Sequence, residues 1–258
     1  MKYDTLTYAL EDGVALITLN RPDVMNALTT QMRAEIDVAV THAGKTARVV
    51  VITGAGRAFC SGQDLGDRAN AADLNLERTL RDEYDPILKA LRECPIPTIA
   101  AINGPAAGAG ANLALGADIV VAAKSASFLE AFARIGLIPD AGGTYWLPRQ
   151  VGFARAMGAA LFADRIPAEK AEAWGMIWEA VDDDAFDSTV RARAAQLAQG
   201  PTETLKRIKR AIRESYGNTL DQQLDLEAHL QGEAGKTRDF IEGVLAFVEK
   251  RAPKFEGR

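Results

Sequence analysis

The sequence predicts an α/β fold with a parallel sheet, followed by a helical C-terminal region. Short apolar runs rich in β-branched residues alternate with longer amphipathic segments, which is typical of parallel α/β folds. From about Pro167 onward the chain is almost continuously helix-forming and carries few strand signals. With 258 residues, the chain can form one large domain, or a domain with an appendage, around an ample core.

The strand signals begin near the N-terminus. Two strand-like runs, 6–10 and 14–19, flank a turn, and Pro22 ends the second run because proline removes a backbone donor. The elements expected next are helix 29–43, strand 49–53, helix 72–91, strand 98–102, helix 108–116, and strands 118–122 and 126–128. The helix-forming segments of the C-terminal region are 167–174, 184–198, 202–215 and 219–250. We expect this region to serve oligomerisation or closure over a site.

Composition and charge argue against several classes of protein. The net charge of −5, without a long basic stripe, argues against nucleic-acid binding. No apolar run reaches the ~18 residues of a membrane span and no signal peptide is evident, which predicts a cytoplasmic protein that binds no membrane. Cys60 and Cys94 lie far apart without partners at metal-ligand spacing, which predicts neither a disulfide scaffold nor a metal site. Neither His42 nor His229 lies in a stretch that indicates a nucleophile system.

Two glycine-bearing turns carry the strongest functional signal. Residues 54–65 and 103–112 each follow an apolar run and place backbone N–H groups beside small side chains. Two such turns can direct two donors at one oxygen, which is how an oxyanion hole is built. The alternative is that each is an ordinary tight turn. A dinucleotide site is disfavoured, because the second turn lacks the third glycine of that motif and no Walker lysine follows either turn.

Motifs along nearly the whole chain resemble the crotonase (enoyl-CoA hydratase/isomerase) superfamily. They are Asn20-Arg21-Pro22 with Asn26-Ala27-Leu28, the glycine turns at 58–65 and 103–110, the loop 136–144, and the closing stretch 247–255. The resemblance implies a superhelix of ββα units, with residues 1–195 as the core that holds an acyl-CoA site. It implies that residues 196–258 form a helical region for site closure and for assembly of a homotrimer, or of a hexamer of two trimers. The CoA thioester would be the substrate, so no separate cofactor is expected.

The same resemblance assigns roles to residues of the turns. The thioester oxygen would accept hydrogen bonds from the backbone N–H groups of Gln63 and Ala109. Removing a proton beside a thioester gives an enolate, and each fixed donor would favour it by about 3 kcal/mol. Arg21, Arg57 with its neighbour Ala58, and Lys250 match positions that bind the nucleotide part of CoA, Lys250 on a neighbouring subunit's ligand. The alternative for each charge is a solvated surface position.

The chain departs from the hydratase pattern of the superfamily at two positions. Hydratases use two glutamates to activate water and deliver a proton, and these positions fall here on Asn112 and Phe132. The nearest acid, Glu130, is two residues out of register. Without paired carboxylates we expect poor hydratase activity.

Asp140 stands in the turn where hydratases carry a glycine, and isomerases of the superfamily place their acid or base there. One base that removes a proton and returns it elsewhere suffices for isomerisation, and apolar neighbours would raise its pKa towards the working range. We expect Phe132, Ile138 and Trp146 to line the acyl pocket around it. The alternative for Asp140 is a helix N-cap.

Within the superfamily, the motifs around Gly62, Gly108 and Asp140 are most similar to isomerases of aerobic phenylacetate degradation. This implies conversion of ring-1,2-epoxyphenylacetyl-CoA to oxepin-CoA, with a cis-3 to trans-2 enoyl-CoA shift as a second activity. The alternatives are a Δ3,Δ2-enoyl-CoA isomerase of fatty-acid β-oxidation, a non-catalytic crotonase-fold binding protein, and an oxidoreductase. Whether Asn112 bonds the ring oxygen or only packs, and whether Glu130 or Asp67 enters the pocket, stays open.

Overall fold

The computed structural model describes residues 2–64, 66 and 75–258, and its framework is a six-stranded sheet. The strand order is β1-β2-β3-β4-β6-β9, with β1 (Leu6–Glu11), β2 (Val14–Leu19), β3 (Val49–Gly54), β4 (Thr98–Ile102), β6 (Ile119–Ala123) and β9 (Glu179–Val181). β1 and β2 form an antiparallel hairpin, and every other neighbouring pair is parallel. The predicted α/β class with a parallel sheet is confirmed.

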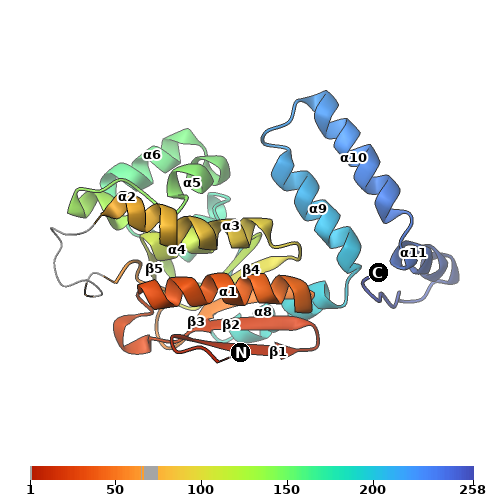
Figure 1. The fold of residues 1–258 in the computed structure, drawn as a ribbon, viewed down its shortest axis with the longest axis horizontal. Helices are drawn as coiled ribbons and strands as arrows, with labels where there is room; N and C mark the ends of the chain where they lie inside the picture. The colour runs from red at the N-terminus through yellow and green to blue at the C-terminus, as the bar shows by residue number, and fades with distance from the viewer. Residues whose placement is uncertain (1, 65, 67–74) are drawn as a thin grey trace.

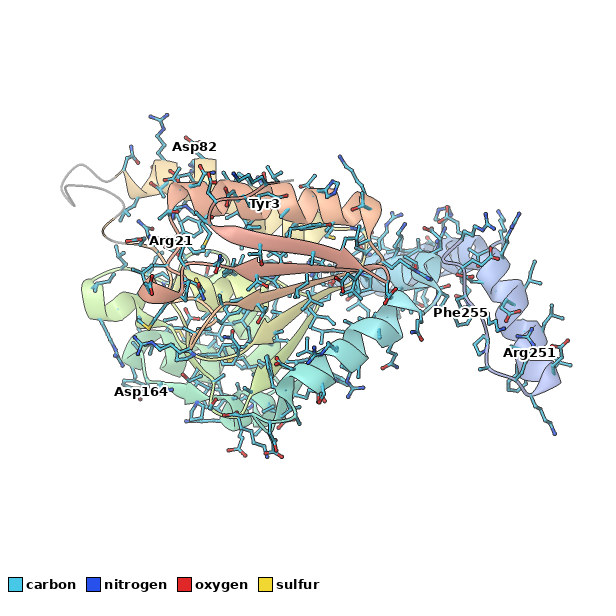
Figure 2. The ribbon with its side chains drawn as sticks, turned by 90° about the horizontal axis from the view of Figure 1, so that it is seen from below. Tyr3, Arg21, Asp82, Asp164, Arg251 and Phe255 are labelled. Carbon is cyan, nitrogen blue, oxygen red and sulfur yellow. The ribbon has the colours of Figure 1, made fainter. Side chains whose placement is uncertain are left out.

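The central strands are buried on both faces. Every residue of β4 and all but one of β3 are buried, which explains their continuous apolar sequences. Figure 2 shows the sheet between α1 (Thr30–Thr46) on one face and α8 (Phe186–Ala198) on the other. The side chain of Thr29 caps α1 by accepting a hydrogen bond from the Met32 N–H at 3.1 Å.

A second, three-stranded sheet positions the residues of the site. It contains β5 (Ala106–Ala107), β7 (Ser127–Leu129) and β8 (Ile166–Pro167), with β7 in the middle. β5 lies directly before α4 (Ala109–Leu115), and it pairs in parallel with β7. The second glycine turn is therefore held against the chain segment that ends at Leu129.

The remaining helices differ in part from the predicted ones. α5 (Gly143–Val151) and α6 (Phe153–Phe162) were not predicted. A single helix was expected over 72–91. The described part of that stretch contains three consecutive helical elements, α2 (Leu76–Thr79), a π-helical turn η3 (Leu80–Tyr84) and α3 (Asp85–Glu93). Two 3₁₀ turns, η1 (Pro22–Val24) and η4 (Ala131–Ile135), lie beside the site loops. The segment after Pro167 contains α7 (Ala168–Ala173) but also strand β9.

The C-terminal helices extend away from the sheet (Figure 1). They are α9 (Thr202–Glu214), α10 (Leu220–Ala234) and α11 (Arg238–Glu249), so the expected segment 219–250 is divided in two. α10 ends at its C-cap Gly235, and Thr237 begins α11, because its side chain caps that helix by accepting from the Phe240 N–H. Residue 195 lies inside α8, which packs on the sheet, and the division of the chain into two regions stays a prediction. In the described residues no helix is long and apolar enough to cross a membrane.

Candidate active site

The two glycine turns lie against each other. Cys60 and Ala106 form a parallel bridge, and the Ala107 N–H donates to the Cys60 carbonyl at 2.9 Å. Gly62, with φ of +93°, packs so closely that a Cβ there would lie 2.8 Å from the Ala107 oxygen and 3.5 Å from the Ala109 nitrogen. Only glycine fits this approach and this backbone conformation. The structure therefore brings together the two turns that the sequence singled out.

The backbone N–H groups of Gln63 and Ala109 are free to bind a ligand. The Leu28 N–H donates to the Gly62 carbonyl and the Asp64 N–H donates to the Leu28 carbonyl, so the intervening Gln63 N–H faces away from Leu28. Ala109 is the first residue of α4, where helical N–H groups have no intrahelical acceptor. Neither N–H donates a hydrogen bond to the described part of the protein. Their use as an oxyanion hole stays a prediction that this arrangement supports.

Asp140 lies in the loop between η4 and α5 with a free carboxyl group. Its carbonyl oxygen accepts from the Gly143 N–H at 2.8 Å and from Asn112 Nδ2 at 2.9 Å, so the loop is held by the backbone. Oδ1 is buried and has no hydrogen-bond partner within the described residues. Burial raises the pKa of this carboxyl to about 6. The N-cap alternative is wrong, because Gly142 occupies the N-cap of α5 and no side chain caps that helix.

Asn112 and Glu130 form the buried polar centre of the site. Asn112 is fully buried on α4, and its Nδ2 donates both to the Asp140 carbonyl and to Glu130 Oε2, the latter at 3.2 Å. Glu130 is 1% exposed, and Oε1 has no hydrogen-bond partner in the described part of the chain. Burial raises the pKa of Glu130 to about 7, the Asn112 bond opposes this, and the charge of Asp140 adds to it. The structure thus places Glu130 beside Asn112. Whether Glu130 enters the acyl pocket stays open, and Asp67 lies outside the described residues.

The predicted pocket side chains have different environments. Phe132 is buried, and its ring lies 3.7 Å from the position of a Cβ at Gly108, next to the predicted oxyanion donor Ala109. Trp146 is partly buried and packs against Gly142. Ile138 is 78% exposed, so its side chain does not bury Asp140 as we expected, because the loop turns it outward. Its place in an acyl pocket stays a prediction.

Arg21, a predicted CoA contact, is engaged within the chain. Its guanidinium donates to Asp64 Oδ2 at 2.7 Å and to the Ala27 carbonyl at 2.6 Å, which ties the loop after β2 to the first glycine turn. Asp64 also accepts from the Gly66 N–H, so it organises this turn. The observed role of Arg21 is structural, and a contact of Arg21 with CoA stays a prediction.

The other predicted CoA contacts are more open or more distant. Arg57 is exposed and, among the described residues, forms no ion pair. Ala58 is buried, and its carbonyl accepts from Asn26 Nδ2 at 2.9 Å. Lys250 ends α11, and Figure 2 places the next residue, Arg251, at the opposite end of the molecule from Arg21. The contact of Lys250 with a neighbouring subunit's ligand stays a prediction.

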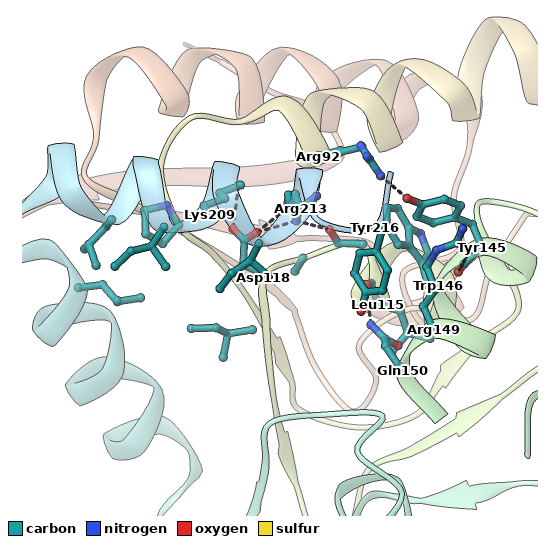
Figure 3. A pocket seen from close by; sticks show the side chains of 18 residues that line it. Arg92, Leu115, Asp118, Tyr145, Trp146, Arg149, Gln150, Lys209, Arg213 and Tyr216 are labelled. Carbon is teal, nitrogen blue, oxygen red and sulfur yellow. Dashed lines mark hydrogen bonds and ion pairs between the residues drawn. The ribbon is translucent and has the colours of Figure 1, made fainter. Parts of the chain in front are cut away.

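A separate cavity of about 360 Å³ lies between α9 and the ends of α4 and α5 (Figure 3). Asp118 in its wall pairs with Lys209 at 2.7 Å and with Arg213 at 2.6 Å. Arg92 donates to the Tyr145 hydroxyl at 2.9 Å. These groups satisfy one another, so the cavity carries no carboxyl group free for catalysis. In the described chain no cluster of His, Cys, Asp and Glu could hold a metal ion.

Comparisons with known proteins show the family and the fold of this chain. Residues 9–258 match the family described as enoyl-CoA hydratase/isomerase. The chain is 59% identical to a protein of Rhodobacter capsulatus named "Probable enoyl-CoA hydratase", over the whole of both chains. It is 48% identical to the 1,2-epoxyphenylacetyl-CoA isomerase of Escherichia coli, over 96% of this chain and 97% of that one. The crystal structure of an enoyl-CoA hydratase from Bacillus anthracis superposes with a TM-score of 0.92 at 32% identity, covering 99% of this chain and 100% of that one. This chain belongs to the enoyl-CoA hydratase/isomerase family.

Proposed function

We propose that this protein is an acyl-CoA isomerase. The observation that carries the proposal is the Asp140 carboxyl group, whose Oδ1 is buried and has no hydrogen-bond partner among the described residues. The backbone carbonyl of the same residue is held through Asn112 to the helix that begins at Ala109. With a pKa of about 6, most of it is ionised at neutral pH, so it can remove a proton. Asn112 and Phe132 occupy the positions at which hydratases carry their two glutamates, and neither can activate water.

The mechanism follows from the placement of these groups. The Asp140 carboxylate removes a proton from the carbon next to the thioester, and the electron pair moves onto the thioester oxygen. The Gln63 and Ala109 N–H groups hold that oxygen, and each is worth about 3 kcal/mol of enolate stabilisation. Collapse of the enolate then moves the double bond or opens an epoxide, and a proton returns at another carbon. No water is consumed.

For the substrate, we propose ring-1,2-epoxyphenylacetyl-CoA, converted to oxepin-CoA, with cis-3 to trans-2 enoyl-CoA isomerisation as a second activity. The motif resemblance and the 48% identity to the E. coli isomerase support this choice. The name of the R. capsulatus relative favours hydration as a second candidate. A Δ3,Δ2-isomerase of fatty-acid β-oxidation and a non-catalytic CoA-binding protein are the remaining alternatives.

The deciding experiment mixes the pure protein with cis-3-hexenoyl-CoA and, separately, with enzymatically generated epoxyphenylacetyl-CoA, following absorbance and mass. Conversion of both at unchanged mass supports the proposal, whereas conversion of the linear substrate alone favours fatty-acid oxidation. A gain of one water from a trans-2-enoyl-CoA refutes it in favour of a hydratase. Asp140→Asn should lose at least ~100-fold in kcat and still bind acyl-CoA. Near wild-type turnover by this variant would exclude Asp140 as the base.

We also propose that the chains assemble as homotrimers, or as hexamers of two trimers. The C-terminal helices expose large apolar side chains, including Ile212, Leu220, Phe240, Phe247 and Val248. Apolar surface of this extent is typical of an interface. Light scattering of the purified protein would give the number of chains, and a monomer at micromolar concentration would contradict the proposal.

A further inference from the structure

The mechanism proposed above gives no task to Glu130, although this carboxyl group belongs to the site. Its side chain is 1% exposed and makes a single hydrogen bond, from Asn112 Nδ2 to Oε2. Oε1 is equally buried and has no partner among the described residues. A buried carboxyl group with one oxygen unsatisfied is costly, and an apolar side chain or an amide would fold at lower cost. Carboxyl groups in such environments are common at catalytic sites.

The backbone places Glu130 beside the predicted oxyanion hole. The Gly108 N–H donates to the carbonyl of Leu129 at 2.8 Å, and Gly108 directly precedes Ala109. Glu130 is the residue after Leu129, so its backbone follows the segment that holds this turn. The ring of Phe132, from the turn that follows Glu130, packs against Gly108. The backbone of Glu130 therefore lies one residue from a direct contact with the predicted oxyanion turn, and its side chain contacts Asn112 of the helix that begins at Ala109.

The side chain of Asn112 joins Glu130 to the loop of the proposed base. Nδ2 donates to Glu130 and to the Asp140 carbonyl, and Asn112 Oδ1 is buried without a partner within the described chain. Three buried oxygens, one each from Glu130, Asn112 and Asp140, thus lack a donor in the described part of the chain. Acceptors that gather in this way are satisfied when a carboxyl group carries a proton or when a ligand brings one.

We propose that Glu130 is the second acid–base group of this site, which gives a proton to the far end of the substrate while Asp140 keeps the one that it removed. The inference rests on the isomerase function proposed above and adds a catalytic residue to it. The sequence did not identify Glu130 because it is out of register with the hydratase glutamates.

The proposed step is balanced in atoms and charge. The Asp140 carboxylate takes a proton from C2 of a cis-3-enoyl thioester, and the C2–H electron pair enters the dienolate. When the thioester carbonyl re-forms, the double bond settles between C2 and C3, and C4 takes the proton of the Glu130 carboxyl group. Asp140 is then protonated and Glu130 is ionised. Between turnovers Asp140 releases its proton to solvent water and Glu130 takes one up from it, so no further reactant is needed.

The protonation states support this division of roles. Burial raises the pKa of Glu130 to about 7 and that of Asp140 to about 6. Between these values Asp140 is mostly ionised and Glu130 mostly protonated, which is the state that the first step requires.

The test uses cis-3-hexenoyl-CoA with both C2 hydrogens replaced by deuterium, and the mass of the trans-2 product. If Asp140 acted alone, it would carry deuterium from C2 to C4, and the product would retain two deuterium atoms. With Glu130 as the donor, C4 receives solvent hydrogen, and we expect mainly singly deuterated product from the wild type. Glu130→Gln keeps the shape of the side chain but removes its acid. This variant should lose at least ~100-fold in kcat, and its remaining product should be richer in the doubly deuterated form.

Each outcome decides between the possibilities. A doubly deuterated product from the wild type, or a slower Glu130→Gln variant with an unchanged label pattern, would reduce Glu130 to a structural role. Unchanged turnover in Glu130→Gln would also overturn the inference and would leave the isomerase function standing. If the wild type itself does not isomerise, the proposed function fails and the inference falls with it. Glu11→Gln is the matched control, because Glu11 is exposed at the end of β1.

Discussion

Replacing Glu130 by glutamine should stabilise the protein at pH 8 but much less at pH 5. The pKa of this carboxyl is about 7 in the folded protein, against an ordinary value of 4.5. Because the pKa of Glu130 is higher in the folded state than in the unfolded state, its contribution to the free energy of unfolding is fully present below pH 4.5. This contribution is lost as the pH rises through 7. One pKa unit corresponds to about 1.4 kcal/mol, so the whole effect is about 3 kcal/mol, of which about 2.5 kcal/mol falls between pH 5 and pH 8.

Urea denaturation followed by tryptophan fluorescence would measure this difference at pH 5, 6.5 and 8. The protein concentration must be the same in all samples, because assembly of the chains contributes to stability. The gain in unfolding free energy of Glu130→Gln over wild type should grow with pH, whereas exposed Glu11→Gln should show no such trend. A gain that is constant across the three pH values would show that Glu130 does not hold a proton near neutrality, and the reasoning would be refuted.

Three further predictions concern catalysis and binding. The kcat/KM of the wild type should rise with pH through about 6, as Asp140 ionises, and fall through about 7, as Glu130 ionises. The Glu130→Gln variant should lack the fall. A pH profile of this variant that is identical to that of the wild type would contradict the assignment of Glu130. Gly143→Ala would put a Cβ 2.4 Å from Asn112 Nδ2 and displace that side chain, so we expect a loss of ~10-fold or more in kcat with an unchanged circular dichroism spectrum. Arg57→Ala should weaken CoA binding by calorimetry without changing Tm, since Arg57 is exposed; equal binding would remove it from the ligand contacts.

Much of the fold was predictable because buried parallel strands have a simple sequence pattern. β3 and β4 are continuous apolar runs, and the structure buries them on both faces. The helices α5 and α6 were not predicted, since α5 begins at glycine and contains Pro148, which interrupts the usual helical pattern. At the break between α10 and α11, Gly235 is the C-cap of the first helix and Thr237 caps the second, and these local signals lie within a long segment of mostly helix-forming residues.

The site was predictable where backbone geometry decides it. Glycines at fixed spacing indicated the two turns, and the structure brings Gly62 against Ala107 and Ala109. Glu130 could not be assigned, because counting residues from Gly136 gives position along the chain but not the direction of a side chain that lies before a 3₁₀ turn. The ion pair of Arg21 and Asp64 joins residues that are far apart in sequence, and a local sequence pattern does not predict such a contact.

Asn112 joins two parts of the buried polar centre through its amide group. A carboxylate at position 112 would have no N–H for Glu130 or for the Asp140 carbonyl, and it would add a third acid beside them. We expect Asn112→Asp to cost roughly 2 kcal/mol or more of stability at pH 8, from lost hydrogen bonds and charge repulsion.

Adding Glu130→Gln to Asn112→Asp should recover part of this stability. The glutamine amide can donate to the new carboxylate, which restores the lost contact with its direction reversed. The bond to the Asp140 carbonyl and the acid at position 130 are not restored, so activity should stay low. A double-mutant cycle in urea would measure the coupling, with Glu11→Gln as an uncoupled partner. If the effects of the two substitutions on unfolding free energy simply add, the Asn112–Glu130 contact contributes nothing to stability. The Asn112 amide then does not connect the carboxyl group of Glu130 to the loop that carries Asp140.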